Sequence, residues 1–256
     1  MPLLECRNVS RYFGGLRAVG GLSLTLEPGE LVGLIGPNGA GKTTVFNMIT
    51  GIFPPTEGEV LLEGRSLAGL APYRVTQSGI ARTFQNIRLY KEMSVLDNVR
   101  TAMHADRGYG LFDALLRTRR FGAAERRLTE QADALLERMK LSARRDEMAG
   151  SLPYGEQRRL EIARALATAP KLLLLDEPAA GMNPSEVGDL LELVRGIQRD
   201  FGLTILLIEH QMSLVMNLCQ RLVVLDFGEA IAQGTPAEIQ SNARVLEAYL
   251  GKVATA

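Results

Sequence analysis

The residues with the clearest chemistry form a glycine-rich segment, GPNGAGKT, that follows a short apolar run. Its glycines let the backbone curl, so that successive N–H groups point inward and can surround the β- and γ-phosphates of a nucleotide. Lys42 adds a cation, and the Thr43 hydroxyl suits Mg²⁺. The segment lies between a strand-like and a helix-like run, so a turn without function explains it poorly. The residues assigned to phosphate binding are Gly36, Pro37, Asn38, Gly39, Ala40, Gly41, Lys42, Thr43 and Thr44.

A pair of acidic residues ends the apolar run KLLLLDEP. Four leucines predict a buried strand, and Asp176 follows them at the end where open α/β sheets present their ligands. We therefore expect Asp176 to hold Mg²⁺ through a water molecule. Glu177 is expected to be the general base that polarises an attacking water, because a carboxylate beside a buried strand needs a compensating charge or metal. Alone, Glu177 would be interpreted as a solvated acid at a strand end.

Two more polar side chains follow short apolar runs. His210 comes at the end of LTILLIEH, and we expect it to contact the γ-phosphate or the attacking water. Gln85 comes after GIAR and before a long helical region. From there it could bind the metal ion and couple the helical region to the nucleotide, although a glutamine there carries no information by itself. His104 is interpreted as a structural histidine.

Two weaker signals concern an aromatic ring and a turn. Phe13 in RYFGG could stack on adenine, with Tyr12 as the nearest alternative, and packing in the core explains either ring almost equally well. Pro153 and Gly155 lie at the start of the helix-like run YGEQRRLEIARALA. A helix that begins at such a turn directs N–H groups and partial positive charge outward, which suits a phosphate. On these residues alone, an ordinary loop entering a surface helix is the better explanation.

The strands that must position these residues are predicted from the apolar runs. Some runs lack alternation and indicate parallel strands buried on both faces. They are residues 30–36, 171–178, 203–210 and 221–228. Other runs alternate better and indicate an antiparallel portion that is half exposed. These are residues 3–10, 22–29 and 59–64.

Strand signals disappear between residues 94 and 167, where the spacing of apolar residues predicts helices. This region is interpreted as a helical lobe inserted into the core. The expected fold is α/β, with a core of residues 1–93 and 168–256 that carries a mixed sheet and an antiparallel β portion. The whole chain, 1–256, is expected to be one domain built from this core and the lobe.

Composition excludes several classes of partner. The 256 residues contain 29 Lys plus Arg and 29 Asp plus Glu, so no overall field favours nucleic acid or an anionic membrane. Cys6 and Cys219 lie far apart and outside any metal-ligand spacing, which indicates buried thiols in a reducing compartment. The apolar runs are shorter than the roughly 20 residues that cross a bilayer, and the start lacks a signal-peptide core. Membrane contact is therefore expected only through a partner.

One local basic patch lies in the segment RGYGLFDALLRTRRFGAAERR. Lipid headgroups or an acidic partner could bind there, but a run of arginines on a helix is more often a solvated face, and that interpretation is favoured. The patch contains Arg107, Arg117, Arg119, Arg120, Arg126 and Arg127 against Asp113 and Glu125. The final run, ARVLEAYLGK, predicts a helix that docks on the core through Val245, Leu246, Tyr249 and Leu250.

The phosphate loop, Gln85, the LPYGEQ turn, the LLLLDEP run and the following histidine resemble, in this order, the ATP-binding cassette of ABC transporters. The resemblance covers nearly the whole chain. Segments such as GPNGAGKTTVFNMITG, RTFQNIRLYKEMSVLDNV, YGEQRRLEIARALAT and DEPAAGMNP are most similar to the LivG-type subunits of branched-chain amino acid importers. The resemblance implies the ABC ATPase fold with a P-loop NTPase core. It also implies ATP and Mg²⁺ as ligands, and hydrolysis of ATP coupled to transport.

The resemblance assigns a role to the signature turn, residues 152–156. In ABC cassettes this turn faces the γ-phosphate bound to the phosphate loop of a second cassette, so that two subunits enclose each ATP. Leu152 and Gly155 match the family's LSGGQ, while Pro153, Tyr154 and Glu156 replace its serine, first glycine and glutamine. These departures predict a weaker or less symmetric arrangement, in which backbone N–H groups and the helix dipole hold the anion.

The partners implied by the resemblance are a second ATPase subunit, in a homodimer or heterodimer, and membrane permease subunits docked near residues 85–96 and the lobe. A substrate-binding protein is an indirect partner, and nucleic acid is not one. The implied location is peripheral, on the cytoplasmic face of the inner membrane. Asn183, in AAGMN, replaces an aspartate of the family's SALD loop, which fits pairing with a different cassette.

Several alternatives stay open. Similar cassettes serve urea or short amides, and others export lipopolysaccharide. A soluble ABC protein acting on nucleic acid usually has two cassettes in one chain or a long coiled-coil insertion, and this sequence shows neither. A P-loop kinase would share the phosphate loop, but the Asp176 and Glu177 pair and the LPYGEQ turn argue against it.

Overall fold

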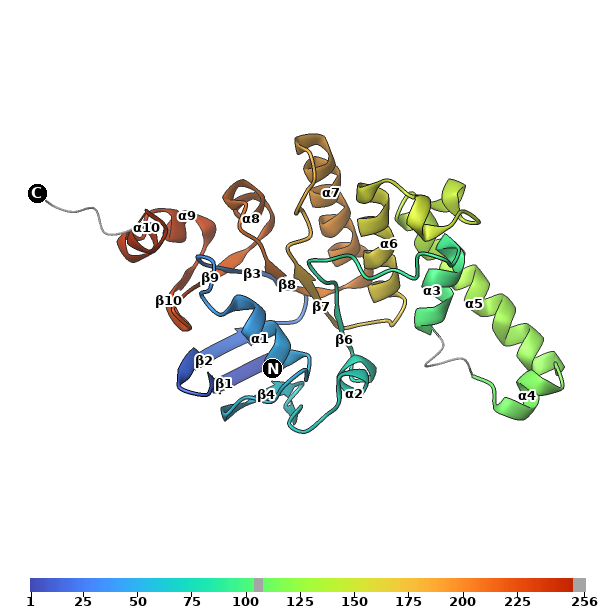
Figure 1. The fold of residues 1–256 in the computed structure, drawn as a ribbon, viewed down its shortest axis with the longest axis horizontal. Coiled ribbons are helices and arrows are strands. Elements are labelled where there is room, and N and C mark those ends of the chain that lie inside the picture. Colours follow the sequence, from blue (N-terminus) through green and yellow to red (C-terminus); the bar gives the residue numbers. More distant parts are fainter. Residues whose placement is uncertain (104–107, 251–256) are drawn as a thin grey trace, which may run out of the picture. The chain divides into compact units, whose positions relative to one another are not determined.

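A computed structural model describes residues 1–103 and 108–250 of the chain (Figure 1). The backbone divides into two compact units, of which the first combines Met1–Arg82 with Lys171–Ala256 and the second is Thr83–Pro170. The second unit is therefore longer at both ends than the lobe expected at residues 94–167. His104 and Arg107 lie outside the described residues.

A six-stranded sheet forms the centre of the first unit, in the order β10-β9-β3-β8-β7-β6. Its strands are β3 (Leu31–Ile35), β6 (Ile80–Arg82), β7 (Leu172–Asp176), β8 (Thr204–Ile208), β9 (Arg221–Asp226) and β10 (Glu229–Gly234). All neighbours are parallel except β10, which pairs antiparallel with β9 at one edge. Every residue of β3, β7 and β8 is buried, which explains why their sequences lack alternation. The ends of β7 and β8 are level, because Asp176 pairs with Ile208.

A smaller, antiparallel sheet in the same unit has the order β2-β1-β4-β5. Its strands are β1 (Leu4–Phe13), β2 (Leu16–Leu26), β4 (Glu57–Leu62) and β5 (Arg65–Ser66). Leu22, Leu24 and Leu26 of β2 are buried, while Ser23 and Thr25 between them are exposed. The alternation read from the sequence is therefore the division between a core face and a solvent face.

Helices of the first unit follow the strands. They are α1 (Lys42–Ile49), α2 (Pro72–Gln77), α7 (Pro184–Phe201), α8 (Met212–Leu218), α9 (Pro236–Gln240) and α10 (Ala243–Leu250). In α10, Val245 is buried and Leu246 remains exposed. Burial raises the pKa of Tyr249, and a hydrogen bond with the backbone of Gly36 opposes that rise. The helix therefore docks through Val245 and Tyr249, whereas Leu246 faces away from the core.

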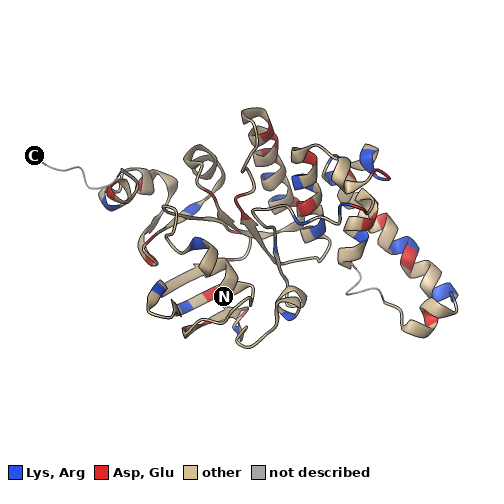
Figure 2. Ribbon diagram, in the orientation of Figure 1, with Lys and Arg blue, Asp and Glu red and all other residues tan. Residues whose placement is uncertain are grey.

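The second unit is helical, with charged residues spread along its longer helices (Figure 2). It contains α3 (Val95–Met103), α4 (Leu111–Leu115), α5 (Arg119–Arg138) and α6 (Tyr154–Leu166), with 3₁₀ turns at Ser142–Arg144 and Ala149–Ser151. Leu128, Ala132, Leu135 and Leu136 of α5 are buried, at the spacing of one helix face. Within residues 1–103 and 108–250, no helix is both long and apolar enough to cross a membrane.

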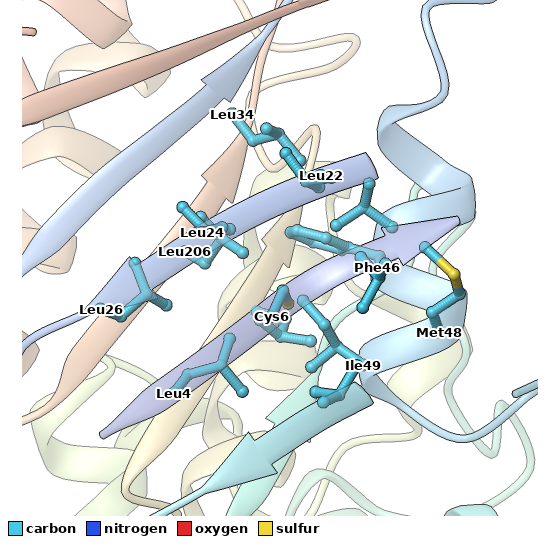
Figure 3. Packing of buried hydrophobic residues seen from close by; sticks show 14 of the residues in the cluster. Leu4, Cys6, Leu22, Leu24, Leu26, Leu34, Phe46, Met48, Ile49 and Leu206 are labelled. Carbon is cyan, nitrogen blue, oxygen red and sulfur yellow. The ribbon is translucent and has the colours of Figure 1, made fainter. Parts of the chain in front are cut away.

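Buried side chains of the two sheets meet around α1 in the first unit (Figure 3). Phe46 is fully buried there, among aliphatic side chains such as Leu4 and Leu24. Both cysteines, Cys6 and Cys219, are buried, and burial raises the pKa of each thiol to about 12. The thiols therefore stay protonated and pack as small apolar groups, as the sequence indicates.

We expect Phe46→Ala to lower the free energy of unfolding by about 3–5 kcal/mol, because it removes a buried ring and leaves a cavity. Phe201→Ala is the matched control, since Phe201 is 47% exposed at the end of α7. Urea denaturation followed by circular dichroism measures both variants. Equal losses of stability would contradict the placement of Phe46 in the core.

Candidate nucleotide-binding site

The phosphate loop connects β3 to α1 and has a shape that requires glycine at two positions. Gly36 has a φ of 149°, and a Cβ atom there would lie 2.0 Å from the carbonyl oxygen of Leu225. Gly41, the residue before α1, has a φ of 99°, and its Cβ would lie 2.5 Å from the carbonyl oxygen of Ala18. A side chain at either position would force the loop away from its neighbours. The glycine spacing seen in the sequence is thus a consequence of close backbone contact.

Lys42 lies across the loop that precedes it. Its Nζ donates to the carbonyl oxygens of Gly36, at 2.7 Å, and Pro37, at 2.9 Å. Desolvation lowers the pKa of Lys42, and the negative charges of Glu177 and Asp176 oppose this effect. The Lys42 ammonium group is nearly buried, and its two carbonyl partners are weakly basic and uncharged. It is therefore well suited to exchange these carbonyls for charged phosphate oxygens.

Asp176, at the end of β7, is held by a buried arginine that the sequence analysis did not single out. Arg82, the last residue of β6, donates through Nη2 to Asp176 Oδ2 at 2.7 Å and through Nη1 to Asn47 Oδ1 at 2.7 Å. The side chains of Arg82 and Asp176 are only 6% and 7% exposed. Arg82 therefore compensates the carboxylate charge and links β6 and β7 to α1. Its only sequence signal was a charged residue at the end of the apolar run GIAR.

Glu177 and His210 lie together at the carboxyl edge of the larger sheet. His210 Nδ1 is 3.7 Å from Glu177 Oε2. Glu177 has a φ of 46°, rare for a residue with a side chain, and its N–H donates to the carbonyl of Ile208 at 2.9 Å. The strand ends thus bring together the two residues that were predicted separately from KLLLLDEP and TILLIEH.

Glu209 is a fully buried carboxylate beside this pair, and the sequence analysis missed it. Its Oε1 accepts from the N–H of Ala179 at 2.9 Å, and its Oε2 accepts from the N–H groups of His210 at 3.1 Å and Gln211 at 3.4 Å. The carboxylate therefore ties the loop after β7 to the loop after β8. An acid that ends the apolar run TILLIE was the available signal.

A hollow of about 330 Å³ adjoins the phosphate loop. It is lined by residues 38–44, which cover the end of the loop and the start of α1, by Leu16, Arg17 and Ala18 of β2, and by Glu177 and Phe227. The ring of Phe13 instead packs edge-on against Phe53, with a centroid separation of 5.3 Å. Residues of β2 rather than Phe13 or Tyr12 therefore line the hollow, and adenine stacking by either ring stays a prediction.

Asn183 begins α7 as its N-cap. Its side-chain oxygen accepts from the N–H of Glu186 at 3.0 Å, and Glu186 Oε2 accepts from the N–H of Asn183 at 2.9 Å. An amide oxygen completes this reciprocal cap as well as a carboxylate does. The replacement of aspartate by Asn183 is thus accommodated locally.

The loop that contains Gln85 is fixed to α6 inside the second unit. Fully buried Arg158 donates to the carbonyl oxygens of Phe84, at 2.6 Å, and Gln85, at 2.8 Å. Glu161 bonds Arg158 Nη1 at 2.7 Å and accepts from the N–H groups of Phe84 and Arg88 at 3.3 and 3.2 Å. Burial raises the pKa of Glu161, and the charge of Arg158 opposes that rise. These bonds explain why this loop belongs to the helical unit and not to the α/β core.

The signature turn, with Leu152 buried at its start, leads directly into α6. Pro153 is the N-cap and has no side-chain oxygen to offer the helix start. The Tyr154 hydroxyl accepts from Arg158 at 3.2 Å, and Glu156 lies 3.2 Å from the guanidinium of Arg144. The negative charge of Glu156 near the helix N-terminus is therefore matched by a cation. One helix, α6, carries both this turn and the groups that hold Gln85.

We expect Arg82→Ala to lower the free energy of unfolding by about 3–5 kcal/mol, because it removes the guanidinium that pairs with the buried Asp176 carboxylate. Arg7→Ala is the control: Arg7 pairs with Glu5 at 2.8 Å on the surface, and its loss should leave stability essentially unchanged. Chemical denaturation compares the two. Equal effects would show that the Arg82 pair has no special structural role.

Known proteins match this chain along nearly its whole length. Residues 19–180 match the family model described as ABC transporter, and residues 231–255 match that of the branched-chain amino acid ATP-binding cassette transporter. The chain is 47% identical to the high-affinity branched-chain amino acid transport ATP-binding protein LivG of Escherichia coli (strain K12), over 98% of both chains. It is 45% identical to the corresponding protein BraF of Pseudomonas aeruginosa, again over 98% of both.

Two further relatives are more distant. The lipopolysaccharide export system ATP-binding protein LptB of Escherichia coli (strain K12) is 37% identical over 98% of both chains. The solved structure of the ADP conformation of MJ1267, an ATP-binding cassette of an ABC transporter, has a TM-score of 0.85 and 35% identity, over 98% of this chain and 100% of that one. With its phosphate loop, acidic strand end and helical unit, the chain belongs to the ABC transporter family as an ATP-binding cassette.

Proposed function

We propose that this chain hydrolyses ATP to power the uptake of branched-chain amino acids through partner membrane subunits. The observation that carries the ATPase part is the meeting of Lys42, Asp176, Glu177 and His210 at one edge of a single sheet. The substrate class is supported by the similarity to LivG and BraF, whose names state branched-chain amino acid transport. Lipopolysaccharide export is the weaker alternative, since identity to LptB is lower. Urea or short amides remain candidate cargo of the same kind of importer.

Each residue at this edge has a distinct proposed role. Lys42 would exchange its two loop carbonyls for the β- and γ-phosphates. Glu177 would take a proton from water as that water attacks the γ-phosphorus and the bond to the ADP oxygen breaks. His210, 3.7 Å from Glu177, would orient the water or hold a γ-phosphate oxygen. Phe13, or Tyr12 beside it, would stack on adenine.

The donor set at this edge fits Mg²⁺, a cation that prefers oxygen ligands. Thr43 lines the hollow and offers a hydroxyl, and Asp176 offers a carboxylate through water. Gln85 would add its amide oxygen from the second unit. When bound, the ion would neutralise charge on the phosphate oxygens during hydrolysis.

A second ATPase subunit is the first proposed partner. The signature turn of one cassette would face the phosphate loop of the other, where the α6 N-terminus and the Gly155 backbone could hold the γ-phosphate without a serine. Closure on ATP would move permease subunits docked beside the Gln85 loop, and hydrolysis would reset them. The pair could be two copies of this chain or two different cassettes. A substrate-binding protein would deliver the amino acid, and this subunit would lie on the cytoplasmic face of the membrane.

We expect Glu177→Gln to form an ATP-dependent dimer, because hydrolysis is blocked while closure is preserved. Light scattering measures the solution mass of the variant with and without MgATP. Lys42→Ala is the control that should stay monomeric, since it lacks the cation for the phosphates. A Glu177→Gln chain that binds ATP and stays monomeric would contradict the homodimer and require a different partner cassette.

We expect cells without this chain to lose uptake of radiolabelled leucine, isoleucine and valine, and the wild-type chain to restore it. Glu177→Gln should fail to restore uptake, because it lacks the general base. Normal uptake of all three amino acids in cells without the chain would overturn the proposed substrate. Formation of ADP that requires an acceptor other than water, without release of free phosphate, would instead indicate a kinase.

A further inference from the structure

The short helix α4 of the second unit exposes its apolar side to solvent, which is the reverse of an ordinary surface helix. Leu111, Phe112, Leu115 and Leu116 are between 71% and 78% exposed. Leu111 and Leu115, and likewise Phe112 and Leu116, are four residues apart, so all four lie on one side of the helix. A surface helix normally buries its apolar side. Here that side is left without cover in the described part of this unit.

Hydrogen bonds hold α4 in this orientation. Asp113, on the opposite side, is half-buried and accepts from the N–H of Gly110 at 3.3 Å and from the Thr118 hydroxyl at 2.9 Å. These bonds lower the pKa of Asp113, so the carboxylate stays ionised and the cap persists at neutral pH. Thr118 is in turn the N-cap of α5, where its hydroxyl accepts from the N–H of Phe121. Through Thr118, these bonds attach α4, with its exposed apolar side, to the start of the long helix α5.

A second anchor comes from Tyr109, which precedes α4 in the chain. The Tyr109 ring packs edge-on against Phe121, with centroids 5.0 Å apart, and its hydroxyl donates to Glu125 at 2.7 Å. Glu125 also accepts from Arg100 at 2.5 Å. Both acids of this segment, Asp113 and Glu125, are half-buried and accept hydrogen bonds from residues of the same unit.

Exposed cations follow the apolar side chains along the chain. Arg117, Arg119, Arg120, Arg126 and Arg127 are all exposed, just after α4 and along the first turns of α5. Hydrogen bonds occupy both carboxylates, and within the described residues 108–127 the charged side chains that are exposed are all arginines. The arginine run by itself was interpreted as a solvated helix face, but solvation does not account for four apolar side chains among the arginines.

We propose that α4 and the start of α5 form a membrane-contact element that binds the headgroup region of anionic lipids. Leu111, Phe112, Leu115 and Leu116 would enter the boundary between headgroups and acyl chains, while the arginines bind lipid phosphates. Exposed arginines beside exposed apolar side chains fit an anionic lipid leaflet, which offers negative phosphates above its acyl chains. A protein partner would have to offer an acidic rim around an apolar pocket.

This element goes beyond the proposed function, because it gives the subunit a lipid contact of its own in addition to its permease partners. It lies entirely in the second unit and includes no residue of the phosphate loop or of the edge formed by Asp176 and Glu177. Variants in it should therefore leave basal ATP hydrolysis unchanged.

The absence of tryptophan from the chain allows a direct test. Phe112→Trp introduces a single tryptophan on the apolar side of α4. We expect its emission to shift to shorter wavelength with vesicles of phosphatidylglycerol, and brominated acyl chains to quench it. Phe201→Trp is the matched control, an exposed phenylalanine on α7 of the other unit, and it should show neither effect.

The charge contribution is tested in the same assay. Arg119→Gln combined with Arg126→Gln should lower the partition coefficient onto these vesicles roughly 25-fold, from about fivefold per arginine, and raised salt should weaken wild-type binding. Equal binding to phosphatidylcholine vesicles, or no shift for Phe112→Trp, would overturn the proposal. So would a Leu111→Ser and Leu115→Ser variant that binds vesicles normally but no longer co-purifies with membrane subunits, because that result would assign the surface to a protein.

Discussion

The first unit depends on direct contact between the backbone of the phosphate loop and two neighbouring strands. A Cβ atom at Gly36 would overlap the carbonyl of Leu225 in β9, and one at Gly41 would approach the carbonyl of Ala18 in β2. Since β9 belongs to the larger sheet and β2 to the smaller one, the loop is shaped by both. The conformation of the loop is therefore built into the junction of the two sheets, and the glycines permit that junction.

Buried charges around this loop are stabilised by partners from both distant and adjacent parts of the chain. Asp176 is paired with Arg82, and the Glu209 carboxylate is satisfied by three backbone N–H groups. Burying such groups without partners would be costly. The same bonds also position the loops that carry Glu177 and His210, so compensation of charge and alignment of the site are achieved by one set of contacts.

The second unit follows the same principle with a helix in place of a sheet. Arg158 and Glu161 on α6 bind the backbone around Gln85, and the signature turn is the start of that helix. A displacement of α6 would therefore carry both segments together. At the start of α5, the same unit exposes the apolar side of α4. These exposed side chains have no role in packing the core of the unit.

The sequence by itself determined the phosphate loop, the buried strands, the helical character of the lobe and the acids Asp176 and Glu177. Their signals are local, because a loop conformation or a buried strand depends on residues that are adjacent in the chain. Tertiary structure decided the roles of Arg82, Glu209 and Arg158, because the fold brings each of them a partner that lies 30 to 94 residues away in the chain. It also decided that α4 turns its apolar side outward, because periodicity marks the two sides of a helix but does not state which of them is covered.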